Sequence, residues 1–382
     1  MSSNGRKNGD DEKTKSKNEP GSKGMMGAIG KPFQRMRRRL TVTGSSGQAE
    51  HIDGADAKSD DGMDKNMEKE KSNNKSKQEK APVYPPHQNK YESAVRCAVT
   101  EYSGVSKKGH APYNPRKKNQ DALIMADDPA TNTLVLCVLD GHGEHGDGVS
   151  QTFRDQLIPE MFNHPTWTTD LKKASADAIA KVERNMLRNY RIDSEFSGTT
   201  LSMAIIRGNT LTGVNIGDSR VIMGREEHGR LTFQDITLDH KPDTPKEKER
   251  ILGCGGRVFA VEYDDGIDGP PRVWLGHMDI PGLAMSRSLG DVVAHSAGVI
   301  SDPEFSEFEL NPTTDRFLVV ATDGLWEFVD SQETVELVEA QAGPTDAVDV
   351  LVTEAATRWM HEEQVIDDTT IVVANLFNYK SN

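Results

Sequence analysis

The stretch "TTLSMAIIRGNTLTGVNIGDSRVIMGREEHGRLTFQDITL", residues 199–238, decides the fold class. Short apolar runs rich in Val, Ile and Leu alternate in it with turn signals at Gly208-Asn209, Gly217-Asp218 and His228-Gly229. Runs of this length joined by short turns are typical of antiparallel strands. The stretch therefore predicts an antiparallel meander.

The neighbouring segments add strands and helices to this meander. Residues 121–140, "DALIMADDPATNTLVLCVLD", predict two strands joined by a polar turn. Residues 171–190, 330–341 and 345–362 instead have apolar residues at helical spacing, and Asp330 before Glu333 predicts a capping box. One predicted helical face comprises Leu171, Ala174, Ala178, Val182, Met186 and Tyr190. Without regular alternation of strand and helix, these elements predict an α+β layered domain.

Composition divides the 382 residues near residue 90. Residues 1–90 hold 19 Lys and Arg against 13 Asp and Glu, a net charge of +6, and their apolar residues show no sustained period. Such a segment buries too little apolar surface to offset its conformational entropy, so we predict a disordered basic tail. We predict a folded domain over 91–377 and a short C-terminal tail over 378–382. The 292 residues after position 90 carry 27 basic and 47 acidic residues, a net charge of −20, which argues against nucleic acid as a partner.

Apolar runs and cysteines suggest the compartment. No run of 18 apolar residues occurs, and the N-terminus has no apolar segment of signal-peptide length, so we expect neither a transmembrane segment nor secretion. Cys97, Cys137 and Cys254 are far apart and form no CxxC pair, which favours a reducing compartment without disulfides. We expect an intracellular monomer in the cytoplasm, the nucleus or both.

Five aspartates stand at the ends of predicted strands: Asp121, Asp140, Asp218, Asp323 and Asp367. Each alone can be an ordinary turn residue, and for the Gly-Asp of Asp218 this alternative stays open. If they converge, their carboxylates would repel one another and be costly to bury unless divalent cations neutralised them. An oxygen-only site suits Mg²⁺ or Mn²⁺ better than zinc.

Eight motifs, in order, resemble the metal-dependent serine/threonine phosphatases of the protein phosphatase 2C family. They span nearly all of residues 91–377 and read "PRKKNQDA", "DGHGEHG", "SGTT", "GDSR", "DHKPDTPKEKERILGCGGRV", "PGLAMSRSLGD", "TDGLWEF" and "DDTT". Each is weak alone, but the eight in this order are specific. The resemblance implies a four-layer αββα sandwich, with two antiparallel β-sheets flanked by helices and the active cleft at one end.

The resemblance also implies the chemistry. Two Mg²⁺ or Mn²⁺ ions in a core site would provide a bridging hydroxide that attacks phosphoserine or phosphothreonine in phosphoprotein substrates. By position in the motifs, Asp140 bridges the ions, Gly141 contributes its carbonyl, Asp323 and Asp367 are further direct ligands, and Asp121 orders metal-bound water. Asp368 follows at a position that is often Asn in the family. Asp218, with Asp323, resembles a third, weaker ion site.

Two cationic side chains complete the implied machinery. Arg116 matches the arginine that binds the substrate phosphate, for which a planar guanidinium has bidentate geometry. His142 matches the general acid that protonates the leaving oxygen. The alternatives are a solvated charge within "PRKKN" for Arg116 and a turn residue for His142. His145 and His240 are predicted to be structural.

The chain departs from the family pattern beside the predicted ligands. Leu139 replaces a frequent aromatic residue, Glu144 a glycine and Gln120 a glutamate, but none of these is a direct ligand. Residues 254–281 occupy the place of the variable flap, where we expect substrate choice to reside. Because all the carboxylates are kept, an enzyme is favoured over a catalytically silent phosphatase-fold binding or regulatory protein. A small-molecule phosphoester hydrolase would share the same ligands.

The predicted tail has one motif of its own, "KPFQRMRRRLTVTG" at residues 31–44. Several arginines precede Leu40-Thr41, an arrangement that basophilic kinases accept, so a kinase acting on Thr41 is a predicted partner. The alternatives are a solvated basic cluster, or a patch attracted to anionic lipid or to the acidic domain. Because position 2 is Ser and not Gly, we expect no N-myristoylation.

Overall fold

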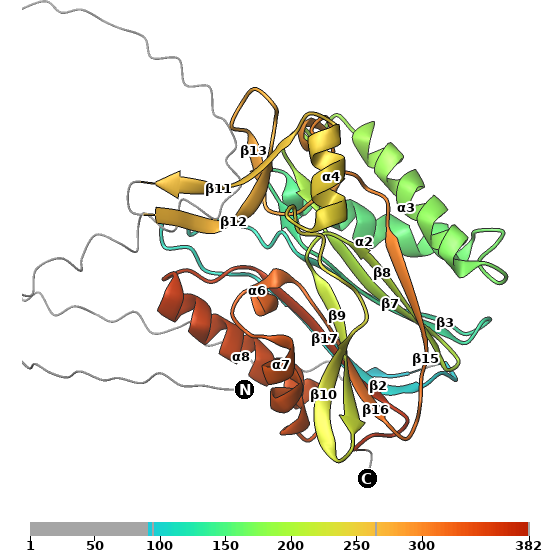
Figure 1. The fold of residues 1–382 in the computed structure, drawn as a ribbon. Helices are drawn as coiled ribbons and strands as arrows, with labels where there is room; N and C mark the ends of the chain where they lie inside the picture. Colours follow the sequence, from blue (N-terminus) through green and yellow to red (C-terminus); the bar gives the residue numbers. More distant parts are fainter. Residues whose placement is uncertain (1–90, 94, 264–265, 381–382) are drawn as a thin grey trace, which may run out of the picture.

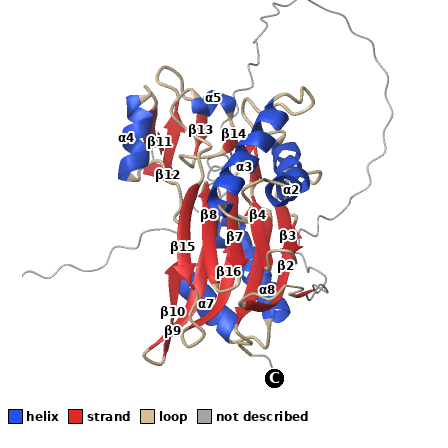
Figure 2. Ribbon diagram, turned by 90° about the vertical axis from the view of Figure 1, so that its right-hand side faces the viewer, coloured by secondary structure: helices blue, strands red, loops and turns tan. Residues whose placement is uncertain are grey.

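Two antiparallel sheets are stacked at the centre of the molecule (Figures 1 and 2). The computed structural model describes residues 91–93, 95–263 and 266–380. The six-stranded sheet has, in spatial order, β1 (Tyr91–Glu92), β2 (Val99–Lys107), β17 (Thr369–Leu376), β16 (Asp315–Ala321), β9 (Arg220–Glu227) and β10 (Arg230–Asp235). The five-stranded sheet has β15 (Glu304–Glu309), β8 (Thr210–Ile216), β7 (Leu201–Arg207), β4 (Thr133–Leu139) and β3 (Ala122–Asp128).

Helices cover the outer face of each sheet. Helices α2 (Gly146–Phe162) and α3 (Leu171–Leu187) pack on the five-stranded sheet and on each other. Helices α6 (Asp323–Trp326), α7 (Ser331–Glu339) and α8 (Pro344–Glu362) pack on the six-stranded sheet. The predicted four-layer αββα sandwich is therefore confirmed.

Strand β4 is apolar from Leu134 to Leu139, and its position in the sandwich explains why. Val135, Cys137 and Leu139 face the cluster under α2 and α3, whereas alternate residues such as Leu134 and Leu136 face the cluster between the two sheets. Successive side chains of a strand point to opposite faces. Because both faces of the strand are covered, every position after Thr133 is apolar.

The structure corrects two predictions. The predicted meander over 199–238 is wrong at its centre, because β7 and β8 belong to one sheet and β9 and β10 to the other. The chain crosses between sheets at Gly217-Asp218, where Gly217 has a φ of 100°, so this turn signal marks a crossover and not a hairpin. The helical face predicted to reach Tyr190 is also too long: α3 ends at Leu187, and Tyr190 is 89% exposed.

A smaller unit sits at one end of the sandwich (Figure 2). It contains α4 (Pro245–Gly253), α5 (Val292–His295) and a sheet of β11 (Arg257–Tyr263), β12 (Gly266–Trp274) and β13 (Pro281–Leu283). Its own apolar cluster includes Ile251, Val273 and Leu283. Another small sheet has the order β14 (Leu289–Gly290), β6 (Gly198–Thr199) and β5 (Gly141–His142).

Some expectations concern residues outside the described ranges. The predicted tail over 1–90, with Thr41, lies there entirely. Within the described ranges, no helix combines the length and apolar character needed to cross a membrane. Cys97, Cys137 and Cys254 are free cysteines.

Candidate active site

Asp121 and Asp140 lie at one edge of the five-stranded sheet. Ala122 at the start of β3 pairs with Leu139 at the end of β4, and the two aspartates are the adjoining residues. In an antiparallel pair, the start of one strand lies beside the end of its neighbour. Strand pairing therefore brings together two carboxylates that are 19 positions apart in the sequence.

The other three aspartates lie at the corresponding end of the six-stranded sheet. Ala321 at the end of β16 pairs with Arg220 at the start of β9 and with Ile371 near the start of β17. The residues just beyond these three strand ends include Asp218, Asp323 and Asp367. The structure therefore gathers the five predicted aspartates at one end of the sandwich.

Asp140 and Asp323 lie close enough at this end to affect each other's ionisation. Burial and the neighbouring carboxylates of Asp323 and Asp121 raise the pKa of Asp140 well above its ordinary value. Burial, with Asp218 and Asp367, raises the pKa of Asp323 to about 7. Negative charge is thus more concentrated here than these carboxyl groups can hold near neutral pH.

Asp121 is buried at the same end of the sandwich. Its Oδ2 accepts hydrogen bonds from the hydroxyls of Thr322 (2.9 Å) and Thr370 (2.7 Å). Its Oδ1 is buried and has no hydrogen-bond partner among the described residues. Burial and the nearby Asp368 carboxylate raise the pKa of Asp121 well above its usual range. The side chain is therefore fixed by one oxygen, and the other remains available.

Asp218 is paired with a cation of the protein itself. Lys241 Nζ lies 2.6 Å from its Oδ2, while its buried Oδ1 has no partner in the described part of the chain. Burial would lower the pKa of Lys241, but the carboxylates of Asp218 and Asp239 raise it overall. His240 holds the preceding turn, because its Nδ1 accepts from the Gly217 backbone N–H at 3.0 Å. His240 therefore has a structural contact, and the Lys241 ammonium neutralises Asp218.

The structure separates the roles of Asp367 and Asp368. Asp368 is buried and accepts backbone N–H groups from Gly109 (2.7 Å) and Gln120 (2.8 Å). Asp367 has a side chain that is 46% exposed. Lys117 bridges both, at 3.2 Å from Asp367 Oδ1 and 2.7 Å from Asp368 Oδ2. Asp368 thus anchors the preceding loop, which leaves Asp367 as the outward-facing carboxylate.

Gly141 occupies a position that admits no side chain. A Cβ atom there would collide with the backbone carbonyls of Gln120 and Gly146. Strand β5 pairs Gly141 with Thr199, and the Thr200 hydroxyl accepts the Asp140 N–H at 3.0 Å. These contacts fix the backbone beside Asp140 and hold Gly141 in place.

The chemistry of these residues fits divalent cations. Within the described ranges, no three His, Cys, Asp or Glu side chains are already arranged to hold a metal ion. The buried, unpartnered oxygens of Asp121 and Asp218 and the raised pKa of Asp140 nevertheless indicate a lack of positive charge. Hard cations with oxygen ligands would supply that charge. Binding would require the carboxylates to turn toward the ions.

His142 and Arg116 differ in how firmly they are held. His142 follows Gly141 in β5, and its Nε2 lies 2.6 Å from Asp291 Oδ2. Burial would lower the pKa of His142, but Asp291 and the more distant Asp218 carboxylate raise it overall. Arg116 is exposed, on the loop between β2 and β3. The second predicted structural histidine, His145, is the N-cap residue of α2, and its backbone N–H bonds to Ser197.

Comparison with known proteins identifies this arrangement. The family model described as protein phosphatase 2C matches residues 107–363, which include Asp121, Asp140, Asp218 and Asp323 and end just before Asp367. The chain belongs to the protein phosphatase 2C family. It is similar to the Arabidopsis thaliana protein named "Probable protein phosphatase 2C 35", with 32% identity over 72% of this chain and 83% of that protein. It is also similar to "Probable protein phosphatase 2C 64" of Oryza sativa subsp. japonica, with 36% identity over 66% of this chain and 61% of that protein.

Solved structures agree on the fold. A serine-threonine phosphatase 2C from Toxoplasma gondii matches with a TM-score of 0.63 at 21% identity, over 76% of this chain and 100% of that one. As a member of the protein phosphatase 2C family, the protein is a serine/threonine phosphatase, a hydrolase of phosphoric monoesters. The family is metal-dependent.

Three charged contacts in this protein phosphatase 2C domain could not be predicted from the sequence. Lys117, Lys241 and Asp291 each pair with a predicted site residue. All three lie inside motifs quoted above, "PRKKNQDA", "DHKPDTPKEKERILGCGGRV" and "PGLAMSRSLGD". Their spacing gives no sign of the partner, because each contact joins distant parts of the chain.

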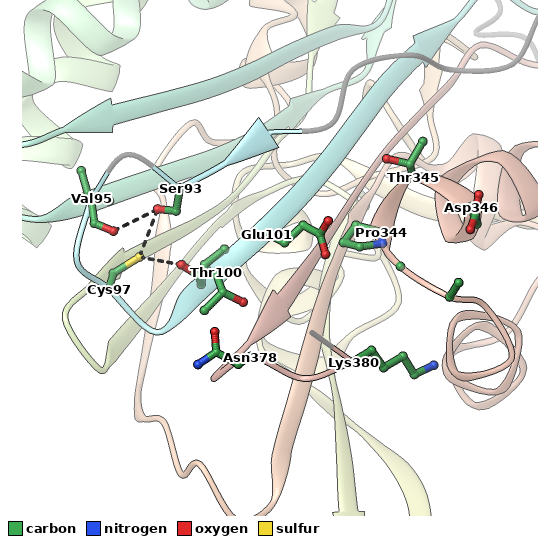
Figure 3. Close-up of a pocket in the computed structure, with 13 residues that line it drawn as sticks. Ser93, Val95, Cys97, Thr100, Glu101, Pro344, Thr345, Asp346, Asn378 and Lys380 are labelled. Carbon is green, nitrogen blue, oxygen red and sulfur yellow. Dashed lines mark hydrogen bonds between the residues drawn. The ribbon is translucent and has the colours of Figure 1, made fainter. Parts of the chain in front are cut away.

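A cavity of about 860 Å³ lies away from the candidate active site (Figure 3). Its walls come from the start of β2, including Cys97 and Thr100, and from the start of α8, including Pro344. Val99 pairs with Leu376 at the end of β17, so the cavity lies at the opposite end of that sheet from the aspartates. It therefore contributes no residue to the candidate active site.

Proposed function

We propose that this phosphatase hydrolyses phosphoserine and phosphothreonine of protein substrates with two divalent cations, Mg²⁺ or Mn²⁺. Asp140, the Gly141 carbonyl, Asp323 and Asp367 would hold them. The observation that carries the proposal is the convergence of the five aspartates at one end of the sandwich, where neighbouring carboxylates raise the pKa values of Asp140 and Asp323. Carboxylates that repel one another in this way call for a divalent cation. When bound, such ions supply a hydroxide nucleophile near neutral pH.

Three side chains of the protein would orient water, bind the substrate phosphate and protonate the leaving group. Asp121, with one free oxygen, would orient water at the site. The guanidinium of Arg116 would bind the substrate phosphate, and its exposed position leaves it accessible to a phosphoprotein. His142 would protonate the leaving serine or threonine oxygen.

Asp218 supports a third ion only if Lys241 moves. The ammonium group of Lys241 occupies the position next to Asp218 Oδ2, at 2.6 Å. A divalent cation there would repel that ammonium group, so binding would be coupled to displacement of Lys241. A third ion at this position would therefore bind more weakly than the first two.

The test uses the full chain and a phosphothreonine peptide. Treatment with EDTA should abolish hydrolysis, and Mn²⁺ or Mg²⁺ should restore it. Asp140→Ala and Asp323→Ala should remain inactive with added metal, whereas the surface control Asp155→Ala, with a side chain that is 64% exposed, should remain active. Full activity after exhaustive chelation, or in either site variant, would overturn the proposal.

The substrate class is tested in the same assay. A protein phosphatase should hydrolyse phosphopeptides far faster than nucleotides or sugar phosphates. The reverse preference would indicate a small-molecule phosphoester hydrolase. Metal binding without hydrolysis of any phosphoester would indicate a catalytically silent binding protein.

A further inference from the structure

The small sheet β14-β6-β5 joins His142 to an aspartate to which the motifs above assign no role. His142 is the second residue of β5, and Asp291 directly follows β14. Strand β6 lies between them, with Gly198 paired to both His142 and Gly290. The sheet therefore brings together two side chains that are 149 positions apart in the sequence.

Asp291 is fixed tightly against the histidine. Its Oδ2 accepts from His142 Nε2 at 2.6 Å and from the Ser288 hydroxyl at 2.6 Å. The residue is 1% exposed. Gly198 makes room for this contact, because a Cβ atom there would collide with the Asp291 carboxylate.

The backbone is held in an uncommon conformation to place this carboxylate. Asp291 has φ 44° and ψ 48°, a left-handed conformation that is uncommon for a residue other than glycine. The Asp291 N–H donates to the Ser197 carbonyl at 3.0 Å, and the Gly290 N–H donates to Glu183 Oε1 at 3.1 Å. The surrounding structure thus enforces a conformation that the chain would not adopt by itself.

The contact leaves one imidazole nitrogen unused. His142 Nδ1 is buried and has no hydrogen-bond partner within the described ranges. A hydrogen bond at one ring nitrogen fixes the orientation and the tautomer of a histidine, and so decides what the other nitrogen can do. Here the nitrogen left for another partner is Nδ1.

We propose that Asp291 is a positioning residue that holds His142 Nε2 and so orients the ring that delivers the proton to the leaving group. The inference rests on the function proposed above. As the bond from phosphorus to the serine or threonine oxygen breaks, its electron pair stays on that oxygen, which takes the proton from the His142 ring. Phosphorus gains its new bond from the water-derived nucleophile, and His142 is reprotonated from solvent.

The test separates this role from a structural one by the leaving group. An alkoxide needs a proton to leave, whereas p-nitrophenolate is stable as an anion, so loss of the proton donor should matter for only one of them. Asp291→Ala should lower kcat on a phosphothreonine peptide by about 10²-fold. On p-nitrophenyl phosphate it should lower kcat by less than about a tenth of that factor. The exposed Asp302→Ala is the matched control and should leave both substrates unchanged.

A double mutant supplies the second readout. If Asp291 acts through His142, then Asp291→Ala should add nothing to His142→Gln on the phosphopeptide, because the energetic effects of coupled residues are not additive. Should Asp291→Ala fail to fold, Ser288→Ala removes one hydrogen bond to Asp291 and should give a smaller loss with the same leaving-group dependence. Equal losses on both substrates, or additive losses in the double mutant, would overturn the inference. A wild-type protein that hydrolyses neither substrate would instead overturn the proposed function.

Discussion

Asp323 joins stability to function at the scale of a single residue. The crowding of carboxylates that raises the pKa of Asp323 to about 7 also lets the site attract cations. Without cations, the same crowding destabilises the folded protein. A carboxyl group whose pKa is higher in the folded state than in the unfolded state binds a proton more tightly when folded. Its stabilising contribution is complete below about pH 4, the unfolded value, and is lost as the pH rises through about 7.

We therefore predict that the EDTA-treated protein becomes less stable between pH 5 and pH 7.5. Asp323→Asn, which cannot ionise, should show a smaller loss over the same interval. Thermal unfolding followed by circular dichroism at the two pH values measures both. Identical pH dependence in the two proteins would contradict the carboxylate repulsion described here.

Arg116 gives the second prediction at this scale. If its guanidinium binds the substrate phosphate, Arg116→Ala should raise KM for a phosphopeptide by about tenfold or more, since a charge-assisted hydrogen bond contributes about 1.5 to 3 kcal/mol. Steady-state kinetics with metal at saturation measures it. Lys118→Ala is the matched control, an exposed cation two positions away that pairs with Asp147. Unchanged kinetics in Arg116→Ala would leave Arg116 as a solvated charge.

Some residues of the site could be predicted from the sequence and others could not. A carboxylate after an apolar run is a local signal, so Asp140 and Asp323 could be singled out from their own strands. The local signal does not separate Asp367 from Asp368, and only the family resemblance assigned Asp367 as the ligand. Only the fold shows that the Asp368 carboxylate is already occupied by hydrogen bonds from the N–H groups of Gly109 and Gln120.

Helix α7 illustrates what local sequence settles at the scale of an element. Asp330 accepts from the Glu333 N–H at 2.8 Å, as the predicted capping box requires. The reciprocal half is absent, because the Glu333 side chain pairs with Arg358 of α8. The local motif thus determines where α7 begins. The Glu333 side chain instead makes a tertiary contact with Arg358.

This cap gives a prediction about stability alone. Asp330→Ala should lower the free energy of unfolding by about 1 kcal/mol, because the first turn loses a side-chain acceptor. Asp330→Ser, which can still cap, should cost less. Urea unfolding measures both variants. A loss of activity in Asp330→Ala without a change in stability would contradict a purely structural role.

Strand pairing shows where sequence reasoning fails at the same scale. The strands β7 to β10 could be predicted from their apolar runs, but not the change of sheet between β8 and β9. A Gly-Asp turn signal is the same for a hairpin and for a crossover. The choice depends on the pairing of β8 with β15 and of β9 with β16, which are distant in the sequence.

At the scale of the whole molecule, the four layers place the functional residues on loops held by rigid strands. Helices cover both sheets and the unit of β11 to β13 covers one end, and the aspartates lie where strands begin or end. Carboxylates that repel one another could not converge on a flexible framework without pushing it apart. The buried apolar clusters on both faces of each sheet supply that rigidity.

The last prediction concerns residues 1–88, which lie outside the described ranges. Every residue of the proposed site falls between Arg116 and Asp367, and a chain that starts at residue 89 keeps β1, whose Tyr91 pairs with Tyr102. Deletion of residues 1–88 should therefore leave kcat on a short phosphopeptide within about threefold of the full chain, a change in barrier of under 1 kcal/mol. Because these residues are basic and the rest is acidic, any effect should fall as salt screens the attraction. A truncated protein that keeps its circular dichroism spectrum but loses activity would place part of the catalytic unit before residue 89.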